Sequence, residues 1–402
     1  MKLLTVIPEL EPFFTSVRHL FLSRIQFRHF TRYVIGLIGA RRKTIRTIAA
    51  SSTECFDQSS LNRFINSDAW DTGTLAKASM KVLADDHGSC PRGVVLLIVD
   101  DTLLEKFGES MDSVGYLYST KDREPVLSHD LVSMLLVCTC GQVVPIDLRQ
   151  YVKAAVTKEE KRVFKTRVEL AREMIESLSL PRHLSGNEVV VLFDSWYLCR
   201  EIVDAVRKRG WHFVAETKSN RNVSLNHAKE VNVGEAGFSI EGEHDCDDVV
   251  MIAEKRYGYR MLNGGVNTFM PSLHKNGNVK IMAERELDGK DEVHYIVTDM
   301  LKVSPEEFLS YFKGRHLTEE FYRDAKQSLG LGKYMLRAHE AINRHWWLVF
   351  IAYNALNHLR MGSASMAEMT VGQLCDWVEE RCESIKWMGT VERRTLGLSS
   401  VI

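Results

Sequence analysis

The sequence predicts a mixed α/β fold, and three stretches carry that prediction. Two apolar runs, GVVLLIVDDT (93–102) and EVVVLFDSWY (188–197), contain an aspartate where the apolar residues stop, which is typical of strands buried on both faces of a sheet. Between them, LVSMLLVCTCGQVVPIDLRQYV (131–152) is typical of a hairpin that turns at Gly141. Charged segments with helical spacing alternate with these strands, so we expect helices to cover the sheet.

The N-terminal 90 residues are expected to be helical. FRHFTRYVIGLIG (27–39) places apolar residues on one helix face, and Arg24, Arg28 and Arg32 form a stripe on another. The first fifty residues hold nine Lys and Arg against two Glu, whereas all 402 residues together have a formal net charge of −1. This basic end is either a solvated helix face or a weak sign of a polyanionic partner. The stretch that follows, 41–67, is compatible with a helix-turn-helix.

The remaining elements are predicted in the same way. Residues 220–290 are rich in Asn, Gly, Asp and Glu and contain short alternating stretches, which predicts an inserted β-rich segment. The other expected elements are helices near 157–178 and 198–210, strands at 212–218 and 292–300, mostly helical chain from 305 to about 360, and a short helix at 371–386 before a loose tail.

The aspartates that end the two buried strands are candidates for a metal site. Asp100 and Asp101 end the first strand and Asp194 ends the second. An aspartate at this position often only caps the next turn or helix. Two carboxylates brought together on one sheet, however, repel each other and need a cation. Mg²⁺ suits such a pair, because it binds one or two carboxylates together with waters and substrate phosphates.

The late segment GRHLTEEFYRDAKQSLGLGKY (314–334) could supply a third carboxylate. At about 100° per residue, Arg315, Glu319, Tyr322 and Lys326 share one helix face. On the opposite side Leu317, Phe321 and Ala325 are expected to pack, leaving the charged face outermost. That face is either an ordinary solvated surface with an Arg–Glu pair at i, i+4 or a metal carboxylate flanked by two cations.

These residues resemble the DDE transposases of bacterial insertion sequences, in the subgroup marked by a Tyr-Arg-Glu-Lys signature. Arg315, Glu319 and Lys326 match the signature spacing, and Phe312 occupies the Tyr position with Tyr311 before it. The first acid of the family ends a strand in a pattern matched by DDT (100–102), and FDSWY (193–197) resembles the second. LSHDLVSMLLV (127–137) and RHWWLVFIAYN (344–354) fit as well, so the resemblance covers roughly 90 to 360.

The resemblance implies a fold and a division of the chain. The fold is a ribonuclease-H-like mixed sheet with flanking helices, interrupted by a β-rich insertion and preceded by a helical domain. The expected domains are a DNA-binding region at 1–90, the catalytic core at 91–219 and 292–365, the insertion at 220–291, and a C-terminal helix and tail at 366–402.

The resemblance also implies an activity, which is metal-dependent cleavage at insertion-sequence ends followed by strand transfer into target DNA. Asp100, Asp194 and Glu319 would be the catalytic residues and would bind two Mg²⁺ ions, for which Mn²⁺ could substitute. Asp100 is preferred over Asp101 because it matches the D-x-T pattern, and Asp101 should point to the opposite face of the strand. DNA phosphates would be held by Arg315, Tyr322, Arg323 and Lys326, and the N-terminal DNA contacts would be Arg24, Arg28, Arg32, Arg41, Arg42 and Lys43.

The expected partners are the terminal inverted repeats and the target DNA, with a homodimer assembled on DNA and a cytoplasmic, nucleoid-associated location in a bacterium. The longest apolar run, around 346–356, is too short to span a bilayer. Two other functions stay open. One is a non-catalytic or domesticated DNA-binding protein. The other is an aspartate-nucleophile phosphatase, although that chemistry usually wants an aspartate two residues after the first, where Thr102 stands.

Overall fold

A central mixed sheet organises the computed structural model, which describes residues 4–52, 57–86, 91–225, 230–236, 240–273, 277–289 and 293–395. The strand order through the middle of the sheet is β2–β3–β1–β5–β6–β13–β12. The strands of this part are β1 (Val94–Glu105), β2 (Gly115–Ser119), β3 (Glu124–Val137), β4 (Val143–Tyr151), β5 (Glu188–Phe193), β6 (His212–Thr217), β12 (Asn278–Glu286) and β13 (His294–Thr298).

The directions of the strands follow from their connections. β3 runs antiparallel to β1 and forms the predicted hairpin with β4, and Gly141 in its turn has a positive φ of 85° that suits glycine. β5 and β6 run parallel to β1 and to each other, because a helix returns the chain to the same end of the sheet each time. This arrangement is a ribonuclease-H-like mixed sheet with flanking helices, as predicted.

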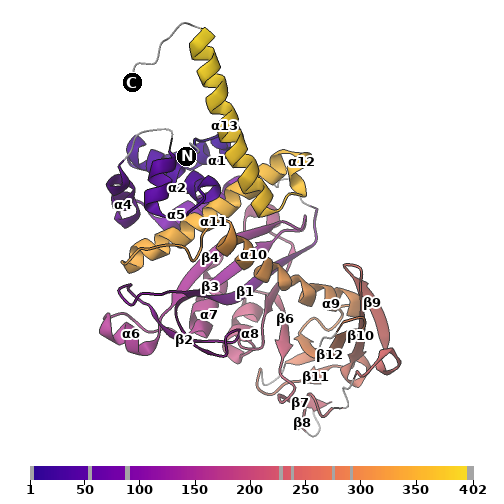
Figure 1. Cartoon of the computed structure of the whole chain (residues 1–402). Helices are drawn as coiled ribbons and strands as arrows, with labels where there is room; N and C mark the ends of the chain where they lie inside the picture. Colours follow the sequence, from indigo (N-terminus) through magenta and orange to yellow (C-terminus); the bar gives the residue numbers. More distant parts are fainter. Residues whose placement is uncertain are drawn as a thin grey trace.

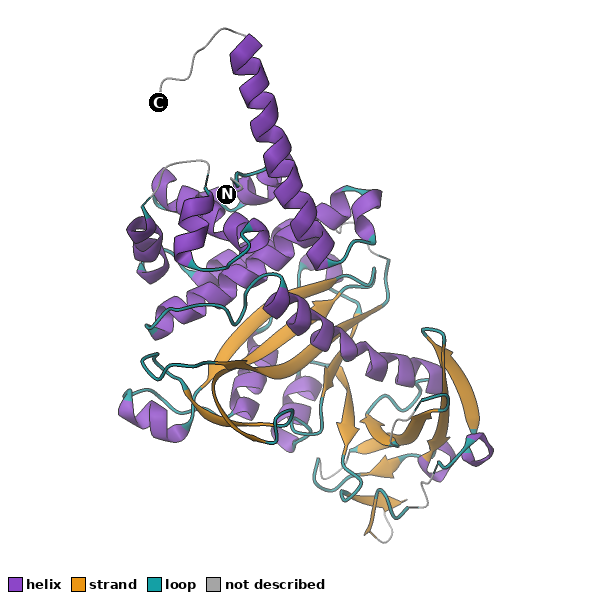
Figure 2. Ribbon diagram, in the orientation of Figure 1, coloured by secondary structure: helices purple, strands orange, loops and turns teal. Residues whose placement is uncertain are grey.

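Helices cover both faces of this sheet (Figure 1, Figure 2). α7 (Arg167–Ser177) and α8 (Arg200–Lys208) share a core cluster with odd-numbered residues of β1, such as Val95 and Leu97. α9 (Pro305–Gly314), α10 (His316–Gln327) and α11 (His339–Gly362) lie on the other face with Ile98 and Leu104. The alternation of side chains along β1 therefore decides which helix layer each residue meets.

The β-rich insertion extends the sheet away from the core (Figure 1). β13 pairs antiparallel with both β6 and β12, which makes the sheet continuous. The other strands of this segment are β7 (Asn222–Leu225), β8 (Glu230–Asn232), β9 (Asp248–Ile252), β10 (Lys255–Met261) and β11 (Thr268–Phe269).

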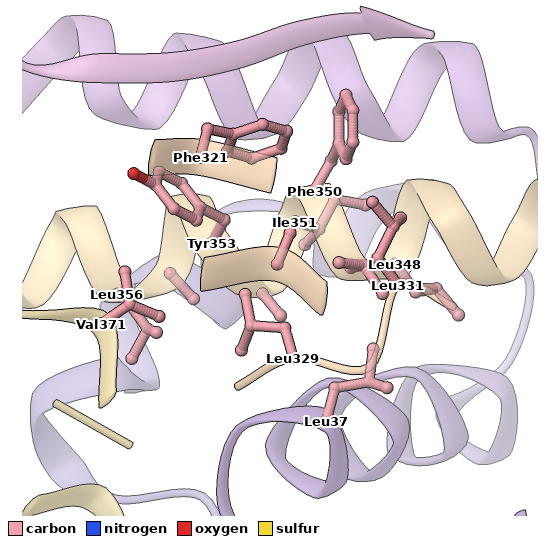
Figure 3. Packing of buried hydrophobic residues seen from close by; sticks show 14 of the residues in the cluster. Leu37, Phe321, Leu329, Leu331, Leu348, Phe350, Ile351, Tyr353, Leu356 and Val371 are labelled. Carbon is pink, nitrogen blue, oxygen red and sulfur yellow. The ribbon is translucent and has the colours of Figure 1, made fainter. Parts of the chain in front are cut away.

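The N-terminal helices pack against α11 rather than standing apart from the core. Leu37 of α2 belongs to the same apolar cluster as Phe321 of α10 and Phe350 of α11 (Figure 3). Tyr33 Oη lies 3.0 Å from His345 Nδ1 of α11 across this boundary. The N-terminal helices are α1 (Glu11–Ser16), α2 (Arg24–Gly39), α3 (Ile45–Ser51), α4 (Gln58–Asn66) and α5 (Thr72–Asp86).

Two helix predictions were wrong in their extent. The helix expected near 157–178 is divided into α6 (Ala154–Glu159) and α7, where Thr166 begins α7 with a capping box to Glu169. The chain from 305 to about 360 is mostly helical, as predicted, with an interruption between α10 and α11. The C-terminal helix is longer than predicted: α13 (Val371–Thr395) follows the short α12 (Ala364–Ala367) and projects away from the body (Figure 1). Among the described residues, no helix is both long and apolar enough to cross a bilayer.

Candidate active site at the ends of strands β1 and β5

Strand register brings Asp100 and Asp194 together. β1 and β5 pair in parallel from Val94 opposite Glu188 to Ile98 opposite Leu192. Two residues further along, Asp100 is level with Asp194 on a strand about 4.8 Å away. Ile98 and Leu192 both face the α10–α11 layer, so the alternation of side chains places Asp100 on that face and Asp194 beside it. The sequence predicted the two strand ends, and the register aligns them.

Asp100 lies in an environment that disfavours its charge. Burial raises the pKa of its carboxyl to about 7, because Arg315 offsets only part of the effect, and Asp101 and Asp194 raise it further. The guanidinium Nη1 of Arg315 is 3.7 Å from Asp100 Oδ2, which is an ion pair longer than a hydrogen bond. A second positive charge at this position would therefore stabilise the ionised carboxylate.

Asp101 faces the opposite layer, as the alternation of the strand predicted. Its Oδ1 accepts a hydrogen bond from the Tyr197 hydroxyl at 2.8 Å, and its Oδ2 lies 3.5 Å from Arg167 Nε. Arg167 Nε also donates to Asp130 Oδ2 at 2.6 Å. Sequence reasoning missed this buried cluster beneath the sheet, because its members come from four separate elements.

Asp194 also serves the local turn. Its Oδ1 accepts from the backbone N–H groups of Trp196 at 2.9 Å and Tyr197 at 3.2 Å. The capping interpretation of this aspartate is therefore correct for one of its oxygens. Among the described residues no hydrogen bond reaches Oδ2, and the two bonds to Oδ1 fix the carboxylate at the strand end. The Trp196 side chain, at the same turn, is one of the large exposed apolar side chains.

Helix α10 is fastened directly onto β1. The Tyr322 hydroxyl donates to the Asp100 carbonyl at 3.0 Å and lies 2.7 Å from Ser133 Oγ of β3. Lys326 Nζ donates to Thr102 Oγ1 at 2.7 Å and to the Leu103 carbonyl at 3.0 Å. The expectation that this face points away from the packed side was wrong. The helix packs on both sides, with Phe321 against Phe350 and Tyr353 of α11 (Figure 3).

Glu319 lies on this helix between Arg315 and Tyr322, but its side chain points outward. The side chain is 59% exposed, and its Oε2 is 3.2 Å from His316 Nδ1. Glu320 is 44% exposed and lies near His316 and Arg323. In the part of the chain that the structure describes, no three His, Cys, Asp or Glu side chains are grouped closely enough to hold a metal ion. The structure thus brings together Asp100 and Asp194 but does not bring the Glu319 carboxylate to them.

A carboxylate that the sequence analysis did not select lies on the next strand. Phe193 of β5 pairs with Ala215 of β6, so Glu216 is level with Asp194. Its Oε1 is 3.3 Å from His294 Nδ1. This hydrogen bond and the charge of Arg315 lower the pKa of Glu216 against the opposing effect of burial. Glu216 belongs to no sequence motif, so it can be identified only from the pairing of β5 with β6.

The N-terminal basic residues are divided between surface and core. Arg24, Arg28 and Arg32 line a cavity of about 730 Å³ together with Arg18. Arg41 and Arg42 are exposed, and Arg323 on α10 is 52% exposed. Lys43 was wrongly expected to contact DNA. Its side chain is buried, its Nζ donates to the Ile38 carbonyl at 3.0 Å, and burial lowers its pKa to about 8.

Comparison with known proteins decides the family. The family of DDE superfamily endonucleases matches residues 15–233, and the transposase DDE domain matches residues 151–355. The chain belongs to the DDE superfamily of transposases. It is therefore a DDE-type DNA transposase, and enzymes of this superfamily generally use divalent metal ions.

Curated proteins and solved structures give less information about the family. No curated protein matches the transposase. Among solved structures, it is similar to a piggyBac transposase in a synaptic complex with hairpin DNA, seen by cryo-EM, at 10% identity and a TM-score of 0.49. That match covers 94% of this chain and 74% of the other.

Proposed function

We propose that this transposase belongs to the subgroup with the Tyr-Arg-Glu-Lys signature, and that it cleaves DNA at the ends of an insertion sequence and joins the 3′-OH ends to target DNA. Asp100, Asp194 and Glu319 are the catalytic carboxylates of this proposal. The observation that carries it is the parallel register that sets Asp100 level with Asp194, beneath a helix fastened to β1 through Tyr322 and Lys326.

The donor set fits a hard divalent cation. Asp100 is a poorly compensated carboxyl whose pKa burial raises to about 7, and Asp194 keeps one oxygen outside its turn. Carboxylate oxygens are the protein ligands that Mg²⁺ prefers, so Asp100, Asp194 and Glu319 would hold two Mg²⁺ ions, with Mn²⁺ as a substitute. When bound, such ions activate the attacking oxygen and stabilise the leaving one in phosphoryl transfer.

Glu319 completes the site by a side-chain movement rather than a helix movement. The backbone of α10 is already held on β1 at Tyr322 and Lys326. The contact that turns the Glu319 carboxylate outward is His316, on the exposed side of the same helix. Releasing this contact costs little, since exposed ion pairs contribute at most about 1 kcal/mol.

The cations around this site have different roles in the proposal. Arg315 and the exposed Arg323 bind DNA phosphates, because a guanidinium suits phosphate. Lys326 Nζ uses two of its three N–H donors on β1, at Thr102 and Leu103, which leaves the third for a DNA phosphate. The phosphate contact expected of Tyr322 is replaced by a positioning role, because its buried hydroxyl holds the Asp100 backbone.

The N-terminal helices recognise the ends of the element in this proposal. Arg24, Arg28 and Arg32, with Arg41 and Arg42, supply the positive charge, and the double-stranded substrates are the terminal inverted repeats and the target DNA. A homodimer assembled on DNA would pair the two ends, and the working location would be the nucleoid of a bacterium.

The test uses the full chain and double-stranded DNA that flanks its gene. Wild-type protein with Mg²⁺ should cut this DNA at the element end, and EDTA should prevent the cut. Asp100→Ala and Asp194→Ala should each abolish cleavage while the DNA is still bound in a gel-shift assay. Cleavage by Asp194→Ala at the wild-type rate would rule out the proposed site. Binding without cleavage by the wild type would favour the non-catalytic alternative.

A further inference from the structure

The chain between α10 and α11 forms an ordered strap across the end of β1. We use "the strap" for residues 330–337. Its side chains alternate, with Tyr334 and Leu336 buried and Lys333, Met335 and Arg337 exposed. An extended segment with one buried face presents its other residues in a row.

Buried polar groups hold the strap in this shape. Lys106, at the end of β1, donates from Nζ to the Gly332 carbonyl at 2.7 Å and lies 3.4 Å from the centre of the Tyr334 ring. The Tyr334 hydroxyl donates to His129 Nδ1 at 2.7 Å, while His129 Nε2 donates to the Asp112 carbonyl at 3.0 Å. Fully bonded networks of this kind rigidify the segments that they join.

Two more contacts fix the ends of the strap. His345 Nε2 donates to the Gly330 carbonyl at 3.1 Å, and the backbone N–H of Asp112 donates to the Arg337 carbonyl at 2.8 Å. Gly330 has a φ of 79°, and a Cβ there would lie 2.5 Å from Lys43 Cγ. The buried Lys43 therefore supports the beginning of the strap.

The outward face of this rigid segment combines positive charge with large apolar side chains. Met335 is 81% exposed between Lys333 and Arg337, and Phe107, which follows Lys106 in the neighbouring loop, is fully exposed at 102%. Two nearby acids have contacts of their own: Asp112 Oδ2 accepts from the backbone of His339, and Glu109 accepts from Tyr116. Cations beside an exposed aromatic and a methionine are typical of surfaces that hold DNA phosphates and press apolar groups against bases.

We propose that the outward face of the strap, made of Lys333, Met335 and Arg337 together with Phe107, binds duplex DNA beside the cleavage site. This inference rests on the proposed function, which puts a scissile phosphate at Asp100. Five residue steps along β1 lead from Asp100 to Glu105, a length of about 17 Å at 3.3 Å per residue. Since each base-pair step spans about 3.4 Å, the strap would meet the duplex within about five base pairs of the scissile phosphate.

The first measurement uses a random-sequence duplex and follows affinity against salt concentration. Each cation that contacts a phosphate contributes about 1 to the slope of log affinity against log salt. Lys333→Ala with Arg337→Ala should therefore lower the slope by about 2. The matched control is Arg182→Ala with Lys208→Ala, which removes two exposed cations from the layer that packs on the opposite face of the sheet. An unchanged slope in the strap variant would overturn the proposal.

The apolar pair is tested on the same duplex. Met335→Ala with Phe107→Ala should weaken binding roughly tenfold, in the range of base contacts by apolar side chains, without changing the salt slope. Met251→Ala with Val266→Ala, two exposed apolar residues of the insertion, should have no effect. If instead the strap variants change only the sedimentation of the DNA-free protein, the face is an interface with a second copy, and the proposal is wrong.

The second measurement tests the position on the DNA. A benzophenone amino acid replaces Met335 in the Asp194→Ala protein, so that cleavage is not required, and the probe is the duplex that flanks the gene. Crosslinks should lie within about five base pairs of the phosphate that wild-type protein cuts. Crosslinks spread evenly along the duplex would contradict the assigned position. If wild-type protein cuts nowhere, the proposed function fails, whereas the salt slopes still decide whether the strap binds DNA.

Discussion

At the scale of single residues, two neighbouring glutamates with the same chemistry differ in geometry. Glu319 follows Arg315 by four residues and precedes Tyr322 by three, on the helix face fastened to β1. Glu320 is turned about 100° around the helix axis from it. We expect Glu319→Gln to lower Mg²⁺-dependent cleavage by about 100-fold or more and Glu320→Gln to retain most of it. Melting temperatures should stay close to the wild type, because both side chains are exposed. A dead Glu320→Gln beside an active Glu319→Gln would show that the assigned helix face is wrong.

Tyr322 is expected to act through the position of Asp100. Its hydroxyl bridges the Asp100 carbonyl and Ser133 Oγ in a buried site. Tyr322→Phe leaves both groups without this partner and should lower the free energy of unfolding by about 1–3 kcal/mol. Chemical denaturation measures this loss, and cleavage at saturating Mg²⁺ should fall as well.

A double variant separates the shared bond from other effects of the Tyr322 hydroxyl. Because Tyr322→Phe and Ser133→Ala remove the same hydrogen bond, their costs should be less than additive in the double variant. Additive costs would show that the two hydroxyls contribute to stability independently.

At the scale of elements, the strap should be sensitive to acid. Burial lowers the pKa values of His129 and His345 to about 4, against about 6.5 in an unfolded chain. The unfolded state therefore binds more protons than the folded state between these two pH values. The contribution of the two neutral histidines to the free energy of unfolding is complete above about pH 6.5 and is lost as the pH falls toward 4. At pH 5 each histidine should lower the free energy of unfolding by about 2 kcal/mol relative to neutral pH.

Hydrogen exchange at pH 7 and pH 5 measures this effect. The amides of the strap and of loop 106–112 should lose protection in acid before those of β5. The reason is that His129 bonds to Tyr334 of the strap and His345 bonds to the Gly330 carbonyl at its beginning. Uniform loss across all elements would indicate global acid unfolding without a weak element.

At the scale of the whole molecule, the N-terminal helices are part of the catalytic core's packing. Arg344 of α11 donates to the Ile65 carbonyl and to Asp68, and Tyr33 meets His345. A chain of residues 91–402 would expose the buried face of α11, so we expect it to lack the cooperative melting transition of the full chain. Calorimetry gives the answer, and a cooperative transition near the wild-type temperature would show that the two parts fold separately.

Point variants test the N-terminal region without removing the helices that pack against α11. Arg24→Ala, Arg28→Ala and Arg32→Ala together should keep a cooperative melting transition, because these side chains line a cavity and do not belong to the apolar core. The salt slope of DNA binding should fall by about 3, or 1 for each phosphate contact. A wild-type slope would mean that this stripe is an ordinary solvated helix face.

Local patterns along the chain were enough to predict the strands, the hairpin, the helix that carries Glu319 and the family resemblance. Buried strands show as apolar runs such as 93–102, and Gly141 marks the hairpin turn, because these signals depend on neighbours along the chain. The spacing of Arg315, Glu319 and Lys326 is equally local. That Asp101 and Asp100 point to opposite faces of the sheet followed from the alternation of side chains along a strand.

Only the tertiary structure decided how these pieces meet. Register sets Asp100 beside Asp194 and adds Glu216 on the next strand, and no local pattern encodes register between strands about 94 residues apart. The burial of Lys43 and the docking of Tyr322 on β1 depend on elements far away in the sequence. How much surface a residue buries depends on which helices and strands pack around it. A polar side chain that its own segment would leave exposed can therefore still become part of the core.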